Sequence, residues 1–126
     1  MERIRAHVVE LCGRVGFPAA EAAKVQLAVD EAAANVMLHS CGGDAAQEIE
    51  VDITCCADEI EVILRDRGVG FDPASHPPKD LKQHLAVFKV GGLGVHLMRT
   101  LLDEVEWTKG VSGNAVRMVK RVHDAK

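Results

Sequence analysis

The strongest constraint on the fold is an eight-residue run, Glu48–Cys55, in which polar and apolar side chains alternate strictly. Such alternation is typical of a β-strand with one buried face. A tight turn at 57–58 follows, and residues 60–66 repeat the same period as a second strand that ends at Asp66. The two runs predict an antiparallel hairpin, which has to bury its apolar face against another layer.

Apolar residues at helical spacing supply that other layer. They predict helices over residues 2–16, from Pro18 to about Leu38, and over 93–102, where leucines recur at a spacing of four. The second helix has an expected core stripe, which comprises Val25, Val29, Ala32 and Val36. Two more strands are expected over 104–108 and 115–122, around a glycine-containing turn.

The order of these elements predicts the fold class. Helix, helix, strand, strand, loop, helix, strand and strand place the helices on one face of a mostly antiparallel sheet. The chain is therefore expected to be an α+β protein, a two-layer α/β sandwich. Its 126 residues are expected to form a single domain, 1–126.

Composition narrows the class of function. The net charge is −4 and the basic residues are scattered, which argues against a nucleic-acid surface. No apolar run approaches the length of a membrane span. The segment Met1–Arg5 is charged from its second residue, so we expect no signal peptide and a cytoplasmic protein with reduced cysteines. The six histidines have no spacing suited to zinc.

One helix carries a carboxylate and an amide on the same face. Glu31 and Asn35 are four residues apart, one helical turn. An amide oxygen is a suitable ligand for Mg²⁺, and a nearby glutamate could orient or deprotonate a nucleophile. The pair taken alone is also compatible with a solvated helix face, which is the commoner case for such residues. Asp30 points about 100° away around the helix, which indicates a surface or supporting role.

Two glycine-containing segments could shape a pocket. Asp66 ends a strand and is followed by Gly68 and Gly70, so it could accept a hydrogen bond from an exocyclic amine such as that of adenine, or simply begin a turn. The run 91–94 opens an apolar helix, where free backbone N–H groups can bind phosphate, although a hinge would have the same composition. It is neither a P-loop nor a dinucleotide-binding fingerprint. Residues 72–91 lack a period and are expected to form a lid, a binding loop or a disordered segment.

Taken in this order, the segments resemble the GHKL ATPase superfamily, whose ATP-binding domain is called the Bergerat fold. The likeness is greatest to its branch of anti-sigma-factor serine/threonine kinases. The N box of that branch is similar to residues 30–39, its first glycine box to 66–73, and its second to 91–106. The closing strand resembles 113–120, so the resemblance covers nearly the whole chain.

The resemblance implies a role for each matching residue. Glu31 would be the general base that activates a substrate serine, and Asn35 would ligate Mg²⁺ between the ATP phosphates. Asp66 would accept the adenine amine. The base pocket would be shaped by Gly68 and Gly70. The phosphates would be cradled by Gly92, Leu93 and Gly94 under an ATP lid at about 72–91.

The resemblance also implies a regulatory function with two protein partners. Such a kinase binds a sigma factor and phosphorylates a serine on an STAS-domain antagonist, using ATP and Mg²⁺, and works as a homodimer. Two alternatives stay open from the residues. One is a non-catalytic nucleotide-binding module that sequesters a partner, and the other is an ATP-hydrolysing part of a larger machine.

Overall fold

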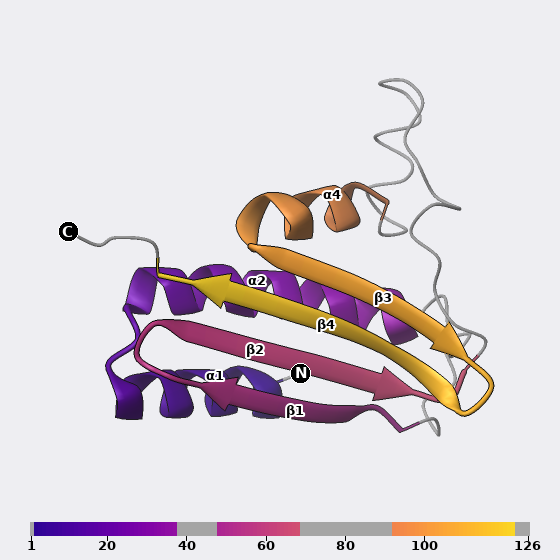
Figure 1. Cartoon of the computed structure of the whole chain (residues 1–126), viewed down its shortest axis with the longest axis horizontal. Helices are drawn as coiled ribbons and strands as arrows, with labels where there is room; N and C mark the ends of the chain where they lie inside the picture. Colours follow the sequence, from indigo (N-terminus) through magenta and orange to yellow (C-terminus); the bar gives the residue numbers. More distant parts are fainter. Residues whose placement is uncertain (1, 38–47, 69–91, 123–126) are drawn as a thin grey trace.

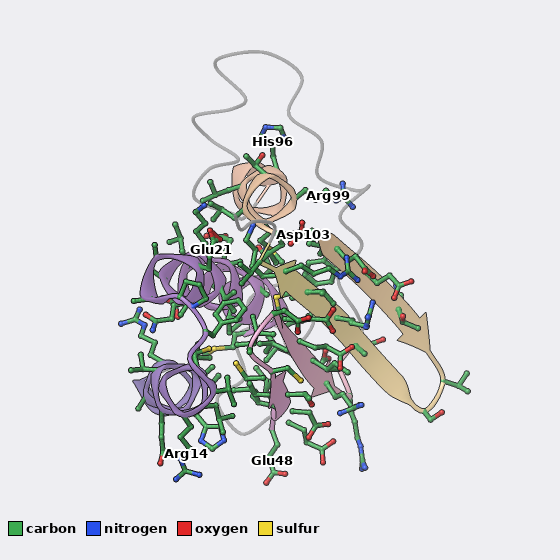
Figure 2. All side chains as sticks on the ribbon, turned by 60° about the vertical axis from the view of Figure 1, so that its left-hand side comes forward. Arg14, Glu21, Glu48, His96, Arg99 and Asp103 are labelled. Atoms are coloured by element: carbon green, nitrogen blue, oxygen red, sulfur yellow. The ribbon has the colours of Figure 1, made fainter. Side chains whose placement is uncertain are left out.

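The computed structural model describes residues 2–37, 48–68 and 92–122 as helices packed on one face of an antiparallel sheet (Figure 1, Figure 2). The helices are α1 (Glu2–Val15), α2 (Ala19–Asn35) and α4 (Gly92–Leu101). The strands are β1 (Glu50–Cys55), β2 (Glu59–Asp66), β3 (Glu104–Gly110) and β4 (Gly113–Arg121). Their order in the sheet is β1-β2-β4-β3, and every neighbouring pair is antiparallel. The expected two-layer sandwich is confirmed.

A compact junction joins α1 to α2. Gly16 has φ +80°, a left-handed conformation that suits glycine after the end of a helix. The Phe17 N–H then donates to the Cys12 carbonyl at 2.9 Å. The sequence predicts Pro18 in the first turn of α2. In the structure Pro18 is the N-cap of this helix, one position before that turn. The carbonyl of Pro18 accepts the N–H groups of Glu21 and Ala22, so the new helix begins at once.

The sheet confirms the hairpin and shows why β1 is less buried than its alternation suggests. β2 and β4 are the central strands, and the inward side chains of β2 are buried as far as Asp66. In β1 the inward residues Val51 and Ile53 are only half-buried, because this strand lies at an edge of the sheet. The strand begins at Glu50, two residues later than the expected Glu48.

The core lies between the two layers and confirms the expected stripe of α2. It also contains Val62 and Leu64 from β2, and Val116 and Met118 from β4. On α4, the leucines that recur at a spacing of four do not all face the core. Leu97 is 37% exposed, whereas Met98 is fully buried. The reason is that α4 packs against α2 at the margin of the sheet, so the side of the helix that carries Met98 and Leu102 faces the core.

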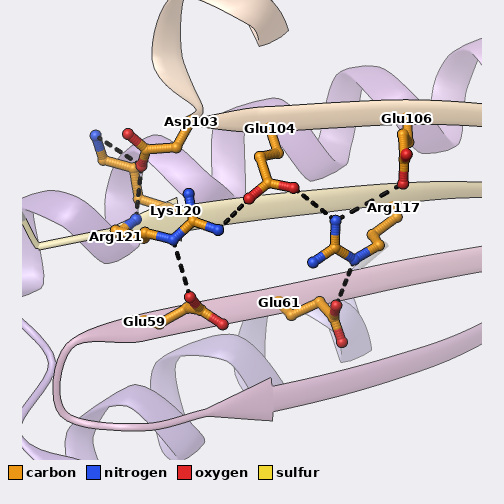
Figure 3. A network of polar contacts seen from close by, with 8 residues as sticks. All are labelled: Glu59, Glu61, Asp103, Glu104, Glu106, Arg117, Lys120 and Arg121. Atoms are coloured by element: carbon orange, nitrogen blue, oxygen red, sulfur yellow. Dashed lines mark hydrogen bonds and ion pairs between the residues drawn. The ribbon is translucent and has the colours of Figure 1, made fainter.

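The outer face of the sheet is covered by charges instead of helices (Figure 3). The Arg117 guanidinium on β4 contacts Glu61 of β2 at 2.5 Å and Glu104 of β3 at 2.7 Å. Arg121 contacts Glu59 at 3.0 Å and also pairs with Glu104. These contacts join three strands, and the two arginines lower the pKa of the Glu104 carboxyl through hydrogen bonds. Exposed pairs of this kind contribute little stability singly.

The β3–β4 hairpin contains a glycine whose replacement should destabilise the fold. Gly113 has φ +138°, and a Cβ there would lie 3.1 Å from the Asp66 carbonyl oxygen. Gly113→Ala is therefore expected to lower the free energy of unfolding by about 1–3 kcal/mol. Thermal unfolding measures it. The matched control is Gly110→Ala, where a Cβ would lie 3.5 Å from its nearest neighbour, an ordinary contact. Equal losses in the two variants would contradict this account.

Candidate functional site

The three sequence segments expected to form a pocket come to one end of the molecule. In Figure 1, α2 and β2 both run towards the end where the β3–β4 hairpin turns, and α4 begins at that end. The C-terminal turn of α2 carries Glu31 and Asn35, the end of β2 carries Asp66, and the first turn of α4 is 92–94. Helix α2 packs against both α4 and β2, and Figure 1 shows these ends towards the same side of the molecule.

Glu31 occupies a partly desolvated position on α2. It is half-buried, and this burial raises the pKa of its carboxyl above the ordinary value of 4.5. The neighbouring Asp30 carboxylate raises the pKa further through charge repulsion. Asp30 itself turns towards α1, where Arg5 Nη2 lies 2.7 Å from its Oδ2. The supporting role expected for Asp30 therefore takes the form of an ion pair between the two helices.

Asn35 is an almost completely buried amide at the end of α2. It is 1% exposed, and its Nδ2 has no hydrogen-bond partner among the described residues. Rotating the amide exchanges its nitrogen and oxygen, and burying an amide without partners is costly. A hard cation beside this side chain would be bound by the amide oxygen. The residue therefore fits the Mg²⁺ ligand that the resemblance implies.

Asp66 is held in place by a short polar network. It is 5% exposed, and its Oδ1 accepts the Gly68 N–H at 2.8 Å and the Asn114 amide at 3.1 Å. The Asn114 Nδ2 also donates to the Gly68 carbonyl at 2.9 Å. These bonds fix both the carboxylate and the turn after it. An acceptor prepared in this way is suited to a ligand that offers an N–H group.

Asn114 is the site residue that the sequence reasoning missed. It is 8% exposed and lies directly opposite Asp66 in the pairing of β2 with β4. A signal was present, because Asn114 is a polar residue on the same face of the strand as buried Val116 and Met118. Such a position indicates a buried polar group that needs a partner. Finding the partner required the strand register, which sequence alone did not supply.

Part of the expected pocket lies outside the described residues. Gly70, the proposed lid at 72–91, and Gly91 fall there. Gly92, Leu93 and Gly94 form the first turn of α4, where backbone N–H groups have no partner within the helix itself. Gly68 is described and takes part in the bonds with Asp66 and Asn114.

A cavity of about 590 Å³ lies at these strand ends, and Asp66 and Asn114 are part of its lining. Its described lining also includes Arg65, Thr108 and Ala115, which alternate to the outer face of the sheet. Glu31 and Asn35 are not part of this lining. The cavity therefore reaches Asp66 and Asn114 of the candidate site from the outer face of the sheet.

Other kinds of site find no support in the described ranges. Residues 2–37, 48–68 and 92–122 contain no group of three or more histidine, cysteine or acidic side chains placed to hold a metal. In the same ranges no helix is both long and apolar enough to cross a membrane. Three cysteines are described, and all are free thiols.

A comparison with protein families now gives the class. A family model described as the histidine kinase-like ATPase domain matches residues 1–120. The chain therefore belongs to the histidine kinase-like ATPase family, which confirms the expected GHKL membership. Two solved chains of the blue-light activated histidine kinase EL346 from Erythrobacter litoralis share the fold, with TM-scores of 0.61 and 0.62 at 20% identity. Each alignment covers 95% of this chain, but only 58% and 40% of the two solved chains.

Similar curated relatives are serine-protein kinases named RsbW. The protein from Listeria monocytogenes is 31% identical over 120 residues, which are 90% of this chain and 74% of that protein. The one from Bacillus subtilis is 33% identical over 122 residues, covering 93% and 75% of the two chains. The likeness to the serine-kinase branch therefore extends along most of the sequence.

Proposed function

We propose that this chain is an ATP-dependent protein serine/threonine kinase that acts as an anti-sigma regulatory factor and phosphorylates a serine on an STAS-domain antagonist. One observation carries the proposal. The half-buried Glu31 carboxylate stands one turn before the buried Asn35 amide, at the end of the fold where Asp66 is fixed by hydrogen bonds. The serine-protein kinases among the relatives support this choice over other ATPase activities.

Glu31 would serve as the general base. Its carboxylate would take the proton of the substrate serine hydroxyl as that oxygen attacks the γ-phosphorus of ATP. The phosphoryl group would move to the serine, and ADP would leave. Because burial raises the pKa of Glu31, its carboxylate holds a proton more firmly than an exposed one does. The partly desolvated setting therefore suits proton abstraction.

Asp66 would select the nucleotide base. Its carboxylate would accept the exocyclic amine of adenine, with Gly68 and Gly70 leaving room for the base beside the backbone. Asn114 would act as a positioning residue, because its amide bridges Asp66 and the Gly68 carbonyl. A prearranged acceptor loses less conformational freedom when the ligand binds.

The backbone of α4 and the side chain of Asn35 would receive the phosphates. The N–H groups of Gly92, Leu93 and Gly94 would donate to phosphate oxygens at a helix N-terminus. Asn35 would hold Mg²⁺, which when bound neutralises charge on the phosphates. Residues 72–91 would form the ATP lid over the nucleotide.

The remaining elements of the proposal concern assembly and partners. We propose that residues 1–126 form one domain that works as a cytoplasmic homodimer. Its partners would be a sigma factor and the STAS-domain antagonist, without direct contact to nucleic acid or membrane. The net charge of −4, with scattered basic residues, supports the absence of a nucleic-acid surface.

Asn35→Ala is expected to weaken ATP binding only when Mg²⁺ is present. The change removes the metal ligand, so the affinity for Mg²⁺–ATP should fall roughly tenfold or more, while binding of ATP with a chelator present should stay the same. Calorimetric titration measures both. The fold should persist, because alanine favours helix and Asn35 Nδ2 has no partner among the described residues.

A matched control for this test is Gln26→Ala, which removes a half-buried amide elsewhere on α2. It should leave both affinities unchanged. If Mg²⁺ strengthened ATP binding equally in wild type and in Asn35→Ala, the assignment of Asn35 as the metal ligand would be wrong. Tight nucleotide binding without any phosphoserine on a co-expressed STAS domain would instead favour the non-catalytic regulatory module.

A further inference from the structure

Two thiols from different layers meet at the end of the sheet opposite the candidate site. Cys12 on α1 and Cys55 at the end of β1 are 43 positions apart in sequence, yet their Sγ atoms lie 3.3 Å apart. Cys12 is 2% exposed and belongs to the core, whereas Cys55 is half-buried at the edge of the sheet. Both are free thiols. The fold therefore brings a buried and a more accessible cysteine into direct contact.

The contact is close to what a disulfide requires. The sulfur atoms in a disulfide are about 2.05 Å apart, so these two would have to approach by roughly 1.3 Å. Side-chain rotation and a small shift of α1 against β1 can supply this movement. The bond would cross from the helix layer to the edge strand.

We propose that Cys12 and Cys55 form an oxidation site, at which a peroxide converts the two thiols into a disulfide that fastens α1 to β1. Cys55, the more accessible thiol, would lose its proton and attack the peroxide oxygen, giving a sulfenic acid and one molecule of water. The Cys12 sulfur would then attack the Cys55 sulfur and displace hydroxide, which takes the Cys12 proton and leaves as a second water. Two thiols are thus oxidised and one peroxide is reduced.

The local environment sets the rate of this step. Burial raises the pKa of Cys12 to about 12 and also raises the pKa of Cys55. Because the thiolate is the reactive form, both groups react slowly near neutral pH and faster as pH rises. We therefore expect the two thiols to be oxidised during prolonged exposure to peroxide and not by brief exposure to traces of it.

The disulfide would constrain the chain without touching the candidate site. The closed loop contains the whole of α2, so the bond would restrict the unfolded chain strongly. Asp66 lies at the opposite end of β2 from Ile60, the residue that pairs with Cys55. We therefore expect oxidation to stabilise the fold and to leave ATP affinity unchanged.

The test uses the full chain with Cys56 and Cys41 replaced by serine. Cys56 is an exposed thiol, and Cys41 lies outside the described residues. Hydrogen peroxide at pH 8.5 is expected to reduce the intact mass by about 2 Da and to raise the melting temperature by about 10 °C or more. Dithiothreitol should reverse both changes. A tryptic peptide joining Cys12 and Cys55 would identify the bond.

Matched variants complete the experiment. Adding Cys55→Ser, or separately Cys12→Ala, should abolish the mass loss and the gain in melting temperature. The first changes only a half-buried edge position, so it keeps the test valid if the second fails to fold. The proposal is wrong if peroxide leaves both thiols free or adds oxygen atoms to them without joining them. It is also wrong if the joined protein melts no higher than the reduced one.

Discussion

Replacing Glu31 with glutamine is expected to lower the rate of serine phosphorylation by about 10²- to 10⁴-fold, the usual range for loss of a general base. Glutamine keeps the size and helix preference of the side chain but cannot accept the serine proton. Nucleotide affinity should stay unchanged, because the proposed contacts to ATP come from Asn35, Asp66 and α4. The measurement is phosphoserine formation on an STAS-domain substrate, with ATP binding by calorimetry beside it.

The stability of this variant provides an independent check. The folded-state pKa of Glu31 lies above the unfolded value, so the carboxylate disfavours folding once pH exceeds the folded pKa. Glu31→Gln should therefore be at least as stable as wild type at pH 7. That advantage should vanish as pH falls below about 4.5, where the native glutamate is protonated. If Glu31→Gln phosphorylated its substrate at the wild-type rate, Glu31 would not be the general base.

The second large effect is expected at Asp66. Asp66→Asn should weaken ATP binding by roughly 100-fold, because a charged acceptor for the adenine amine is replaced by a neutral amide. The same change disturbs the network around Asp66, whose Oδ1 accepts both the Gly68 N–H and the Asn114 amide. The free energy of unfolding should fall by about 1–3 kcal/mol. Calorimetry and thermal unfolding separate the two effects.

Two comparisons make this result interpretable. Asp52→Asn removes an exposed carboxylate of β1 that pairs with Arg65 on the outer face of the sheet, so it should leave ATP affinity as it is. Asn114→Ala should weaken binding less than Asp66→Asn, since Asn114 would act only by positioning Asp66 and the backbone of Gly68. Unchanged ATP affinity in Asp66→Asn would contradict the proposed base pocket.

The fold could be predicted largely from periodicity, because each element repeats one pattern over many residues. The alternation in β1 and β2 fixed the hairpin, and the stripe of α2 identified its buried face. The leucine spacing of α4 did not identify its buried face, since Leu97 and Met98 are both apolar and only the packing of that helix against α2 decides between them. Element ends were also displaced, as in β1, which begins at Glu50 instead of Glu48.

Residues of the candidate site could be proposed from sequence where the chemistry follows local spacing. Glu31 and Asn35 share a helix face, and Asp66 ends a strand. Each of them could therefore be proposed from the few residues around it in the sequence. Asn114 and the contact between Cys12 and Cys55 depend on residues more than 40 positions apart, joined by strand register and layer packing. The raised pKa of Glu31 likewise follows from tertiary burial, which the neighbouring residues in sequence do not reveal.

The charged outer face of the sheet has a consequence for solubility. A two-layer fold leaves one sheet surface open, and an open surface invites stacking with the same surface of another copy. Here Arg117 and Arg121 lie on either side of Val119, which is fully buried although its strand position faces outward. Both cations are already paired with glutamates of their own molecule, so the same face of a second copy finds neither arginine free to bind its carboxylates. Crowded copies of this protein should therefore resist face-to-face precipitation.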